Sequence, residues 1–195
     1  PDKNILNSDQ ELLNLISDDK VDIVISAIVG FAGLKASLMA VNAGKTVLIA
    51  NKESIVAAGD ILMPLARSKG SIIIPIDSEH NAIFQCLPED KTTKDVDKIT
   101  ITASGGPFIN IPLSKLSDIS PKDALKHPNW EMGSKVSIDS ATLVNKCLEL
   151  IEARYLFDLN EKFFDLVIHP QSIVHSIVTY KDGSSISQMS NPNME

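Results

Sequence analysis

The stretch Ser71-Ile72-Ile73-Ile74-Pro75-Ile76-Asp77-Ser78-Glu79-His80-Asn81 joins an apolar segment directly to a polar one. The isoleucine-rich residues 71–76 are typical of a buried strand. In an open α/β sheet, ligands bind at the carboxyl ends of the strands. The stretch therefore predicts both a strand of a parallel sheet and a ligand site where that strand ends.

Upstream, apolar strands alternate with helices that are separated by short connections. The predicted strands are 21–28 and 46–50, and the predicted helices are 9–16, 34–43 and 55–68. Gly44 and Gly70 stand where helix-ending glycines are expected. Residues 1–76 therefore predict part of a Rossmann-like parallel sheet, covered by helices on both faces.

Downstream, the pattern changes to strands that can pair antiparallel. The predicted elements are a strand at 99–103, a turn at 104–107, a helix starting at Ser120-Pro121, a long helix over 140–156, and strands at 166–168, 173–180 and 185–189. The fold class is thus α/β, with an α+β catalytic domain over residues 77–195 following the partial parallel sheet.

The composition limits the classes of function. A formal net charge of −7 over 195 residues, with dispersed lysines, argues against a nucleic-acid partner and favours a small-molecule phosphate. We also expect no membrane segment, since no apolar run reaches the length of a span. Cys86 and Cys147 lie in apolar contexts, which predicts two reduced core thiols and a reducing cytoplasm.

Asp77 and Glu79 are the first candidate metal ligands. In an extended segment, side chains two residues apart share a face, and paired carboxylates suit Mg²⁺ or Mn²⁺. The neighbouring His80 also admits Zn²⁺. A helix N-terminus explains the same residues, with Asp77 or Ser78 as the cap and Glu79 in the first turn. The spacing leaves both interpretations open.

A second polar group lies within residues 136–149. Ser140 stands at the predicted helix start, where free backbone N–H groups attract anions. Asn145 and Glu149 are four residues apart and share a helix face, with Lys146 beside them. These residues predict a phosphate pocket, and Glu149 would supply a third carboxylate for the metal. The alternative is an exposed helix with a capping serine.

Three further segments combine polar residues with loop signals. Asn51, Lys52 and Glu53 follow a strand, where ligand contact and helix capping are both possible. The small residues of Ser104-Gly105-Gly106-Pro107 allow a close ligand approach or form a simple turn. Residues 126–133 predict a lid that carries His127 and Trp130, or an ordinary structural loop. His169 and His175 are interpreted as groups that pack or that support ligand-contacting residues.

Six segments, in order and spanning most of the chain, resemble the successive motifs of the 1-deoxy-D-xylulose 5-phosphate reductoisomerase family. They are residues 50–54, 75–85, 104–108, 127–133, 139–149 and 169–172. The resemblance implies rearrangement of a ketose phosphate followed by hydride transfer from NADPH. The product would be 2-C-methyl-D-erythritol 4-phosphate, an intermediate of non-mevalonate isoprenoid biosynthesis.

The resemblance also implies roles for individual residues. The family binds a divalent ion, which is Mg²⁺, Mn²⁺ or Co²⁺. Its metal ligands correspond to Asp77, Glu79 and Glu149. The catalytic groups correspond to Lys52, Glu79 and His127. The other substrate contacts correspond to Ser78, Ser104, Trp130, Ser140, Asn145, Lys146 and Glu149, with Met132 joining Trp130 in the lid. The NADPH contacts correspond to Asn51, Glu53 and Gly133.

Two departures from the family pattern concern the ends of the chain. No G-x-G-x-x-G fingerprint occurs, because Gly30-Phe31-Ala32-Gly33 comes too late and lacks the third glycine. The family's C-terminal helical domain is also missing, so we expect the central part of a longer protein. Its expected state is a homodimer in a bacterial cytoplasm, or in a plastid or apicoplast of a eukaryote. Two alternatives stay open: an inactive substrate-binding or dimerisation fragment, and a nucleotide-independent sugar-phosphate isomerase or aldolase.

Overall fold

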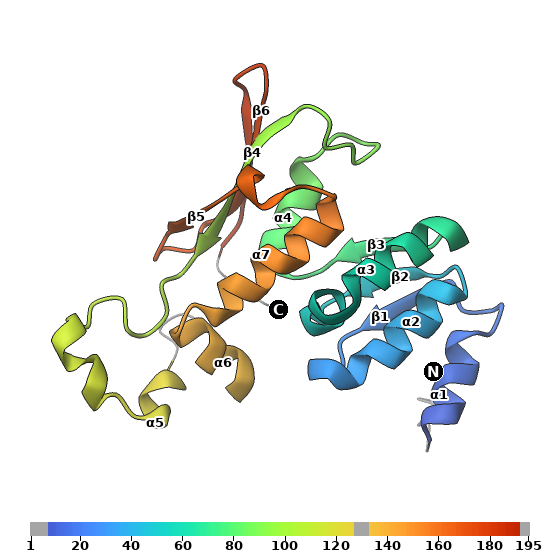
Figure 1. The fold of residues 1–195 in the computed structure, drawn as a ribbon, viewed down its shortest axis with the longest axis horizontal. Helices are drawn as coiled ribbons and strands as arrows, with labels where there is room; N and C mark the ends of the chain where they lie inside the picture. The colour runs from blue at the N-terminus through green and yellow to red at the C-terminus, as the bar shows by residue number, and fades with distance from the viewer. Residues whose placement is uncertain (1–7, 127–132, 192–195) are drawn as a thin grey trace. The chain divides into compact units, whose positions relative to one another are not determined.

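The computed structural model describes residues 8–126 and 133–191 (Figure 1). The chain divides into two compact units between Asp77 and Ser78, one residue beyond the predicted domain boundary. Below, unit 1 denotes residues 1–77 and unit 2 denotes residues 78–195.

Unit 1 is a three-stranded parallel sheet with helices between the strands. Its elements are α1 (Asp9–Ile16), β1 (Ile23–Ser26), the 3₁₀ turn η1 (Gly30–Gly33), α2 (Leu34–Asn42), β2 (Thr46–Ile49), α3 (Lys52–Lys69) and β3 (Ile72–Pro75). The strand order is β1-β2-β3, and Ile23 pairs with Thr46, which pairs with Ile72. The predicted parallel, Rossmann-like alternation is therefore confirmed.

The helix ends of unit 1 follow local chemistry. Gly44 and Gly70 have φ values of 70° and 67°, as expected of helix-ending glycines. Helix α3 begins at Lys52 rather than at the predicted Ile55. The reason is Asn51, whose side-chain oxygen accepts a hydrogen bond from the Ser54 N–H at 2.8 Å and so caps the helix.

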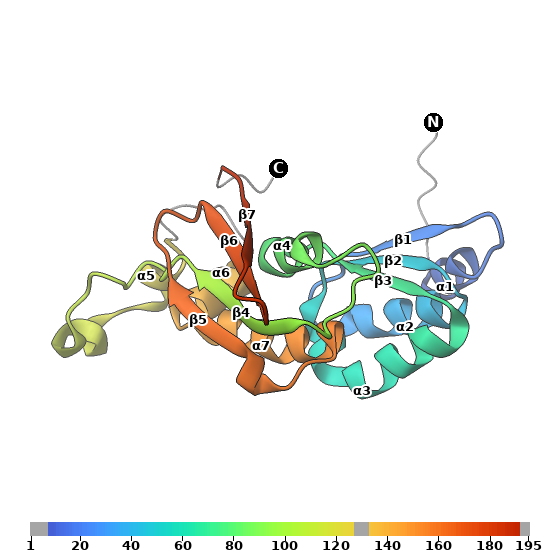
Figure 2. The same cartoon turned by 90° about the horizontal axis from the view of Figure 1, so that it is seen from above.

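The two faces of the parallel sheet differ. Helices α2 and α3 lie on the same side of the sheet (Figure 2), and Val47 and Ile49 of the central strand are buried. Ile23, Ile25 and Ile72 share the opposite face by register and are 57%, 66% and 56% exposed. The expectation of helical cover on both faces is therefore wrong for the described part of unit 1.

Unit 2 combines helices with a four-stranded mixed sheet. Its helices are α4 (Ser78–Cys86), η2 (Leu113–Asp118), α5 (Pro121–Ala124), α6 (Ser134–Ala141), α7 (Val144–Phe157) and η3 (Glu161–Phe163). Its strands are β4 (Val96–Ala103), β5 (Phe164–Ile168), β6 (Val174–Tyr180) and β7 (Ser185–Met189), in the order β5-β4-β6-β7. The predicted antiparallel pairing is present in the pairs β4–β6 and β6–β7, while β4 and β5 pair in parallel.

One hydrophobic core holds unit 2 together. Helices α4 and α7 both contribute to it, packing Ile83 and Phe157 with Ile99 and Ile101 of the central strand β4. Full burial of one such side chain stabilises the fold by roughly 1.5–3 kcal/mol. This core fixes α4 and α7 relative to one another, and thereby positions the polar residues at their N-terminal ends.

The predicted long helix over 140–156 is present as α7, but its predicted start at Ser140 is wrong. Helix α6 ends at Ala141 and α7 begins at Val144, because Leu143 adopts a left-handed conformation with φ 61°. A left-handed residue cannot continue a right-handed helix. Among residues 8–126 and 133–191, the helices are too short or too polar to cross a lipid bilayer.

Candidate metal- and phosphate-binding site

In unit 1, Asn51 connects the end of β2 to the loop that follows β1. Its side-chain amide donates to the carbonyls of Ile28 and Gly30, the latter at 2.8 Å, while its oxygen caps α3. A Cβ at Gly33 would lie 2.7 Å from the Ile28 oxygen, so only glycine permits this close approach. The Asn51 side chain therefore caps a helix, which was one of the two explanations that the sequence allowed.

Lys52 and Asp77 form an ion pair in unit 1. The Lys52 Nζ lies 2.5 Å from the Asp77 Oδ2, and both side chains are largely buried. Lys52 is the first residue of α3, and Asp77 follows β3 by two residues. Both therefore lie where parallel strands end, as the sequence predicted for ligand-binding groups. Glu53, the next residue, lies half-buried in the first turn of α3.

Glu79 lies in the first turn of α4 in unit 2. The Ser78 hydroxyl donates to the Glu79 Oε2 at 2.5 Å, and the Ser176 hydroxyl donates to the Glu79 backbone carbonyl at 3.0 Å. The extended segment proposed for Asp77 and Glu79 is therefore wrong, because the helix already begins at Ser78. Glu79 therefore lies at a helix N-terminus, where serine and acidic residues are favoured, and this position leaves its carboxylate able to bind a metal ion.

Lys146 of α7 links two carboxylates. Its Nζ lies 2.5 Å from the Glu79 Oε1 and 2.6 Å from the Glu149 Oε2. Burial alone would lower the pKa of this ammonium, but the charges of Glu149 and Glu79 together outweigh burial and raise the pKa above its ordinary value. The Asn145 amide also donates to the Glu149 Oε1. Lys146 is therefore a buried cation held by two acidic side chains.

Behind this group lies a buried contact that the sequence did not predict. The His80 Nδ1 is 3.0 Å from the Glu152 Oε2, and the His80 Nε2 is 2.9 Å from the Glu149 backbone carbonyl. Both side chains are almost fully buried. The available signal was that Glu152 follows Glu149 by three residues, which places both on one helix face. His80 and Glu152 join α4 to α7 beneath the two carboxylates.

The turn after β4 approaches the end of α6. A Cβ built on Gly106 would lie 2.9 Å from the Ser140 carbonyl oxygen, and Gly106 has φ 66°. The Ser104 turn and Ser140 are therefore neighbours, as a shared phosphate pocket requires. However, Ser140 lies in the last turn of α6 and not at a helix start, so the predicted N-terminal anion site is wrong at that residue. Asn145 and Lys146 are the residues in a first turn.

Other predicted residues differ in their outcome. His127, Trp130 and Met132 lie outside the described residues, whereas Gly133 is the residue before α6. His169 accepts hydrogen bonds from the N–H groups of Ile173 and Val174 through its Nε2, which agrees with a packing role. Both cysteines are free, but Cys147 is exposed and is not the predicted core thiol.

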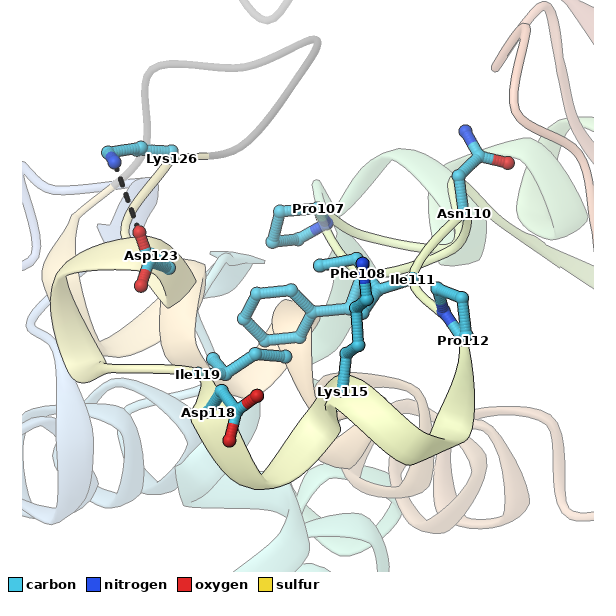
Figure 3. A pocket seen from close by; sticks show the side chains of 10 residues that line it. All are labelled: Pro107, Phe108, Asn110, Ile111, Pro112, Lys115, Asp118, Ile119, Asp123 and Lys126. Carbon is cyan, nitrogen blue, oxygen red and sulfur yellow. Dashed lines mark hydrogen bonds and ion pairs between the residues drawn. The ribbon is translucent and has the colours of Figure 1, made fainter.

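An open cavity of about 540 Å³ lies between the turn after β4 and the η2–α5 segment (Figure 3). Its lining residues are Pro107, Phe108, Asn110, Ile111, Pro112, Lys115, Asp118, Ile119, Asp123 and Lys126. At its edge, Asp123 and Lys126 form an exposed ion pair at 3.1 Å. None of the described residues predicted for the site lines this cavity, so it is separate from the Glu79–Lys146–Glu149 group.

The fold and this group define a class: an α/β protein in which a Rossmann-like unit precedes an α+β unit with a buried carboxylate centre. The protein-family model for 1-deoxy-D-xylulose 5-phosphate reductoisomerase matches residues 2–59 of the sequence. The family model for the C-terminal domain of that enzyme matches residues 73–157. The chain belongs to the 1-deoxy-D-xylulose 5-phosphate reductoisomerase family.

Curated relatives of that name agree with the assignment. The relative from Acinetobacter baylyi is 52% identical over 201 residues, covering 99% of this chain and 50% of the relative. The relative from Psychromonas ingrahamii is 50% identical, covering 98% of this chain and 50% of the relative. The chain thus spans about half the length of the curated relatives it matches.

Solved structures give the same result. A crystal structure of DOX-P reductoisomerase with NADPH, fosmidomycin and magnesium matches with a TM-score of 0.91 at 50% identity, covering 96% of this chain and 48% of that one. The Zymomonas mobilis 1-deoxy-D-xylulose 5-phosphate reductoisomerase with NADPH matches with a TM-score of 0.86 at 46% identity, covering 95% and 47%.

Proposed function

We propose that the protein carrying this chain is a 1-deoxy-D-xylulose 5-phosphate reductoisomerase. It rearranges the ketose phosphate with the aid of a divalent metal ion and reduces the product with NADPH to 2-C-methyl-D-erythritol 4-phosphate. The observation that carries the proposal is that the Glu79 and Glu149 carboxylates both contact the buried ammonium of Lys146. The chain in which they do so is 52% identical to a relative of that name.

The proposed metal ligands are Asp77, Glu79 and Glu149. The fit rests on the oxygens of Glu79 and Glu149, which both lie within 2.6 Å of the Lys146 Nζ and therefore face one position of positive charge. Asp77 is two residues from Glu79, so their Cα atoms lie within roughly 7 Å in any chain conformation. Such oxygen donors suit Mg²⁺, Mn²⁺ or Co²⁺, and the ion would supply Lewis-acid polarisation of the substrate oxygens.

The proposed phosphate contacts are Ser104, Ser140, Asn145 and Lys146. Three observations support them: the close approach of Gly106 to Ser140, the place of Asn145 and Lys146 in the first turn of α7, and the charge of Lys146. His127 is assigned beside them from the family resemblance. Binding energy from the unreactive phosphate would orient the reacting end of the substrate.

The proposed contacts at the reacting end and the cofactor rest mainly on the family resemblance. Lys52, Ser78 and Glu79 would contact the reacting carbons, and the ion pair with Asp77 supports an oriented Lys52 ammonium. Asn51, Glu53 and Gly133 would contact NADPH, which is bound in two of the similar crystal structures. Trp130 and Met132 would form the lid.

We further propose a homodimer in the cytoplasm of a bacterium. Strand β7 pairs only with β6 among the described residues, and its Ile186 and Met189 are exposed. An edge strand that has a neighbour on one side only, and that carries apolar side chains, is a template for pairing with a second copy.

The proposal is tested by a Glu149→Gln substitution in the protein expressed from its gene. We expect the wild type to oxidise NADPH only when 1-deoxy-D-xylulose 5-phosphate and Mg²⁺ or Mn²⁺ are both present. Loss of one carboxylate should lower kcat/KM roughly hundredfold or more, because the ion would lose a ligand. The measurement is the absorbance of NADPH over time, with the branched product identified by NMR.

Glu161→Gln is the matched control, since it removes the same charge from a glutamate at the surface of unit 2. The rate of NADPH oxidation by Glu161→Gln should equal that of the wild type. Circular dichroism establishes that each variant is folded. Turnover without metal, turnover without NADPH, or full activity of folded Glu149→Gln would each contradict the proposal. Turnover without NADPH would instead indicate a sugar-phosphate isomerase or aldolase.

A further inference from the structure

The ammonium of Lys146 occupies the position toward which two of the proposed metal ligands point. Its side chain is 8% exposed and that of Glu149 is 1% exposed, so water screens their attraction little. Both contacts, at 2.5 Å to Glu79 and 2.6 Å to Glu149, are short even for charge-assisted hydrogen bonds. The carboxylate pair is thus already neutralised in part by a group of the protein itself.

A divalent cation and this ammonium cannot use the same oxygens together. Two positive charges within about 4 Å repel each other strongly in a buried environment, and the oxygen of each glutamate that faces this position already contacts the Lys146 ammonium. A metal ion that enters must therefore displace Lys146. The lysine stem has four flexible carbons, so its ammonium can move while the helix stays in place.

We infer that Lys146 is the resting counter-ion of Glu79 and Glu149, and that a divalent cation and the Lys146 ammonium compete for these two carboxylates. The displaced ammonium is then released to bind the substrate phosphate. This inference rests on the proposed function, in which Lys146 contacts that phosphate and the two glutamates hold the metal.

The competition has a thermodynamic consequence. A displaced ammonium that finds no new anion is a buried, unpaired charge, which is costly. A phosphate group that accepts it removes this cost, so the metal ion and the phosphate should each raise the other's affinity by the same factor. Lys146 would thereby couple two ligands that bind to opposite ends of the substrate-binding region.

The test is a titration of the purified chain with Mn²⁺, followed by electron paramagnetic resonance of the free ion. In Lys146→Met the competing charge is absent, so we expect Mn²⁺ to bind on the order of tenfold more tightly or better. A second titration adds methylphosphonate, which carries the phosphate-like group without a metal-chelating end. It should tighten Mn²⁺ binding in the wild type and have no such effect in Lys146→Met.

Two further variants complete the design. Lys98→Met removes an exposed lysine of unit 2 that pairs with Asp165, so it changes the net charge equally and should bind Mn²⁺ as the wild type does. Lys146→Arg keeps a cation at the site and should keep the weaker affinity of the wild type. Thermal melting establishes that every variant is folded, and Lys146→Gln replaces Lys146→Met if the latter does not fold.

The outcomes separate this inference from the proposed function. Equal or weaker Mn²⁺ binding in folded Lys146→Met or Lys146→Gln would overturn the competition, provided that Glu149→Gln still loses Mn²⁺ binding. If Glu149→Gln binds Mn²⁺ like the wild type, the metal site itself is misassigned and the proposed function fails first. Tightening that also occurs in Lys98→Met would reduce the effect to net charge and would likewise overturn the inference.

Discussion

Gly106 combines two constraints at a single residue. It has a positive φ of 66°, and a Cβ there would lie 2.9 Å from the Ser140 carbonyl oxygen and 3.2 Å from the Ala141 Cα. The first constraint disfavours any L side chain, and the second requires the backbone of α6 to move. This one residue therefore sets how closely the Ser104 turn approaches Ser140.

Gly106→Ala should separate these two proposed phosphate contacts. We expect the free energy of unfolding to fall by about 2–3 kcal/mol, measured by urea denaturation, and the affinity for methylphosphonate to fall with it. Gly183→Ala is the control, because Gly183 also has a positive φ, of 87°, but nothing lies within 4 Å of its Cβ position. The free energy of unfolding of Gly183→Ala should fall by only about 1–2 kcal/mol. Equal losses in both variants would contradict a steric role for Gly106.

At the scale of single residues, the motifs predicted some of the polar side chains that lie together in unit 2. Glu79, Lys146 and Glu149 were predicted as ligand-binding groups, and the structure brings these three together. The contact between His80 and Glu152 was missed, since it joins residues far apart in the chain. The direct contacts of Lys146 with both carboxylates were missed for a related reason: the sequence cannot show which anion a buried ammonium faces.

At the scale of elements, the His80–Glu152 contact fixes α4 against α7. Glu152→Leu would leave His80 buried without its acidic partner, so we expect a loss of about 3 kcal/mol in the free energy of unfolding. The double variant His80→Leu/Glu152→Leu should recover part of this loss, because no polar group of the pair then remains buried. Urea denaturation of the four proteins of the cycle measures the coupling.

Glu161→Leu is the control for this cycle, since Glu161 lies at the surface and should change the free energy of unfolding by no more than about 0.5 kcal/mol. Additive effects of the two substitutions would show that His80 and Glu152 do not act as a pair.

Element types were predictable and element ends less so. Strands and helices of unit 1 followed from apolar runs and helix-ending glycines, whereas the start of α3 depended on Asn51, which also suits a ligand contact. The break between α6 and α7 was not predictable, because Leu143 adopts a positive φ without any glycine or proline nearby to indicate it.

At the scale of the whole molecule, the edge strand β7 is where the proposed homodimer can be tested. Ile186→Lys places a charge on this edge, which should prevent pairing with a second copy and shift the protein towards monomer. Sedimentation velocity measures the shift. Ile109→Lys is the matched control, since Ile109 is an exposed isoleucine in the turn after β4 and outside the strands. An unchanged dimer in Ile186→Lys would exclude β7 as the interface.

The isoleucine face of the parallel sheet in unit 1 also affects how stability depends on temperature. Unfolding raises the heat capacity chiefly because it exposes apolar surface, by about 12–15 cal/mol/K per residue in ordinary domains. Ile23, Ile25 and Ile72 already contact water in the folded chain, so their unfolding adds little to that change. Taken by itself, unit 1 should consequently have a smaller heat capacity of unfolding than its length suggests, and a flatter curve of stability against temperature.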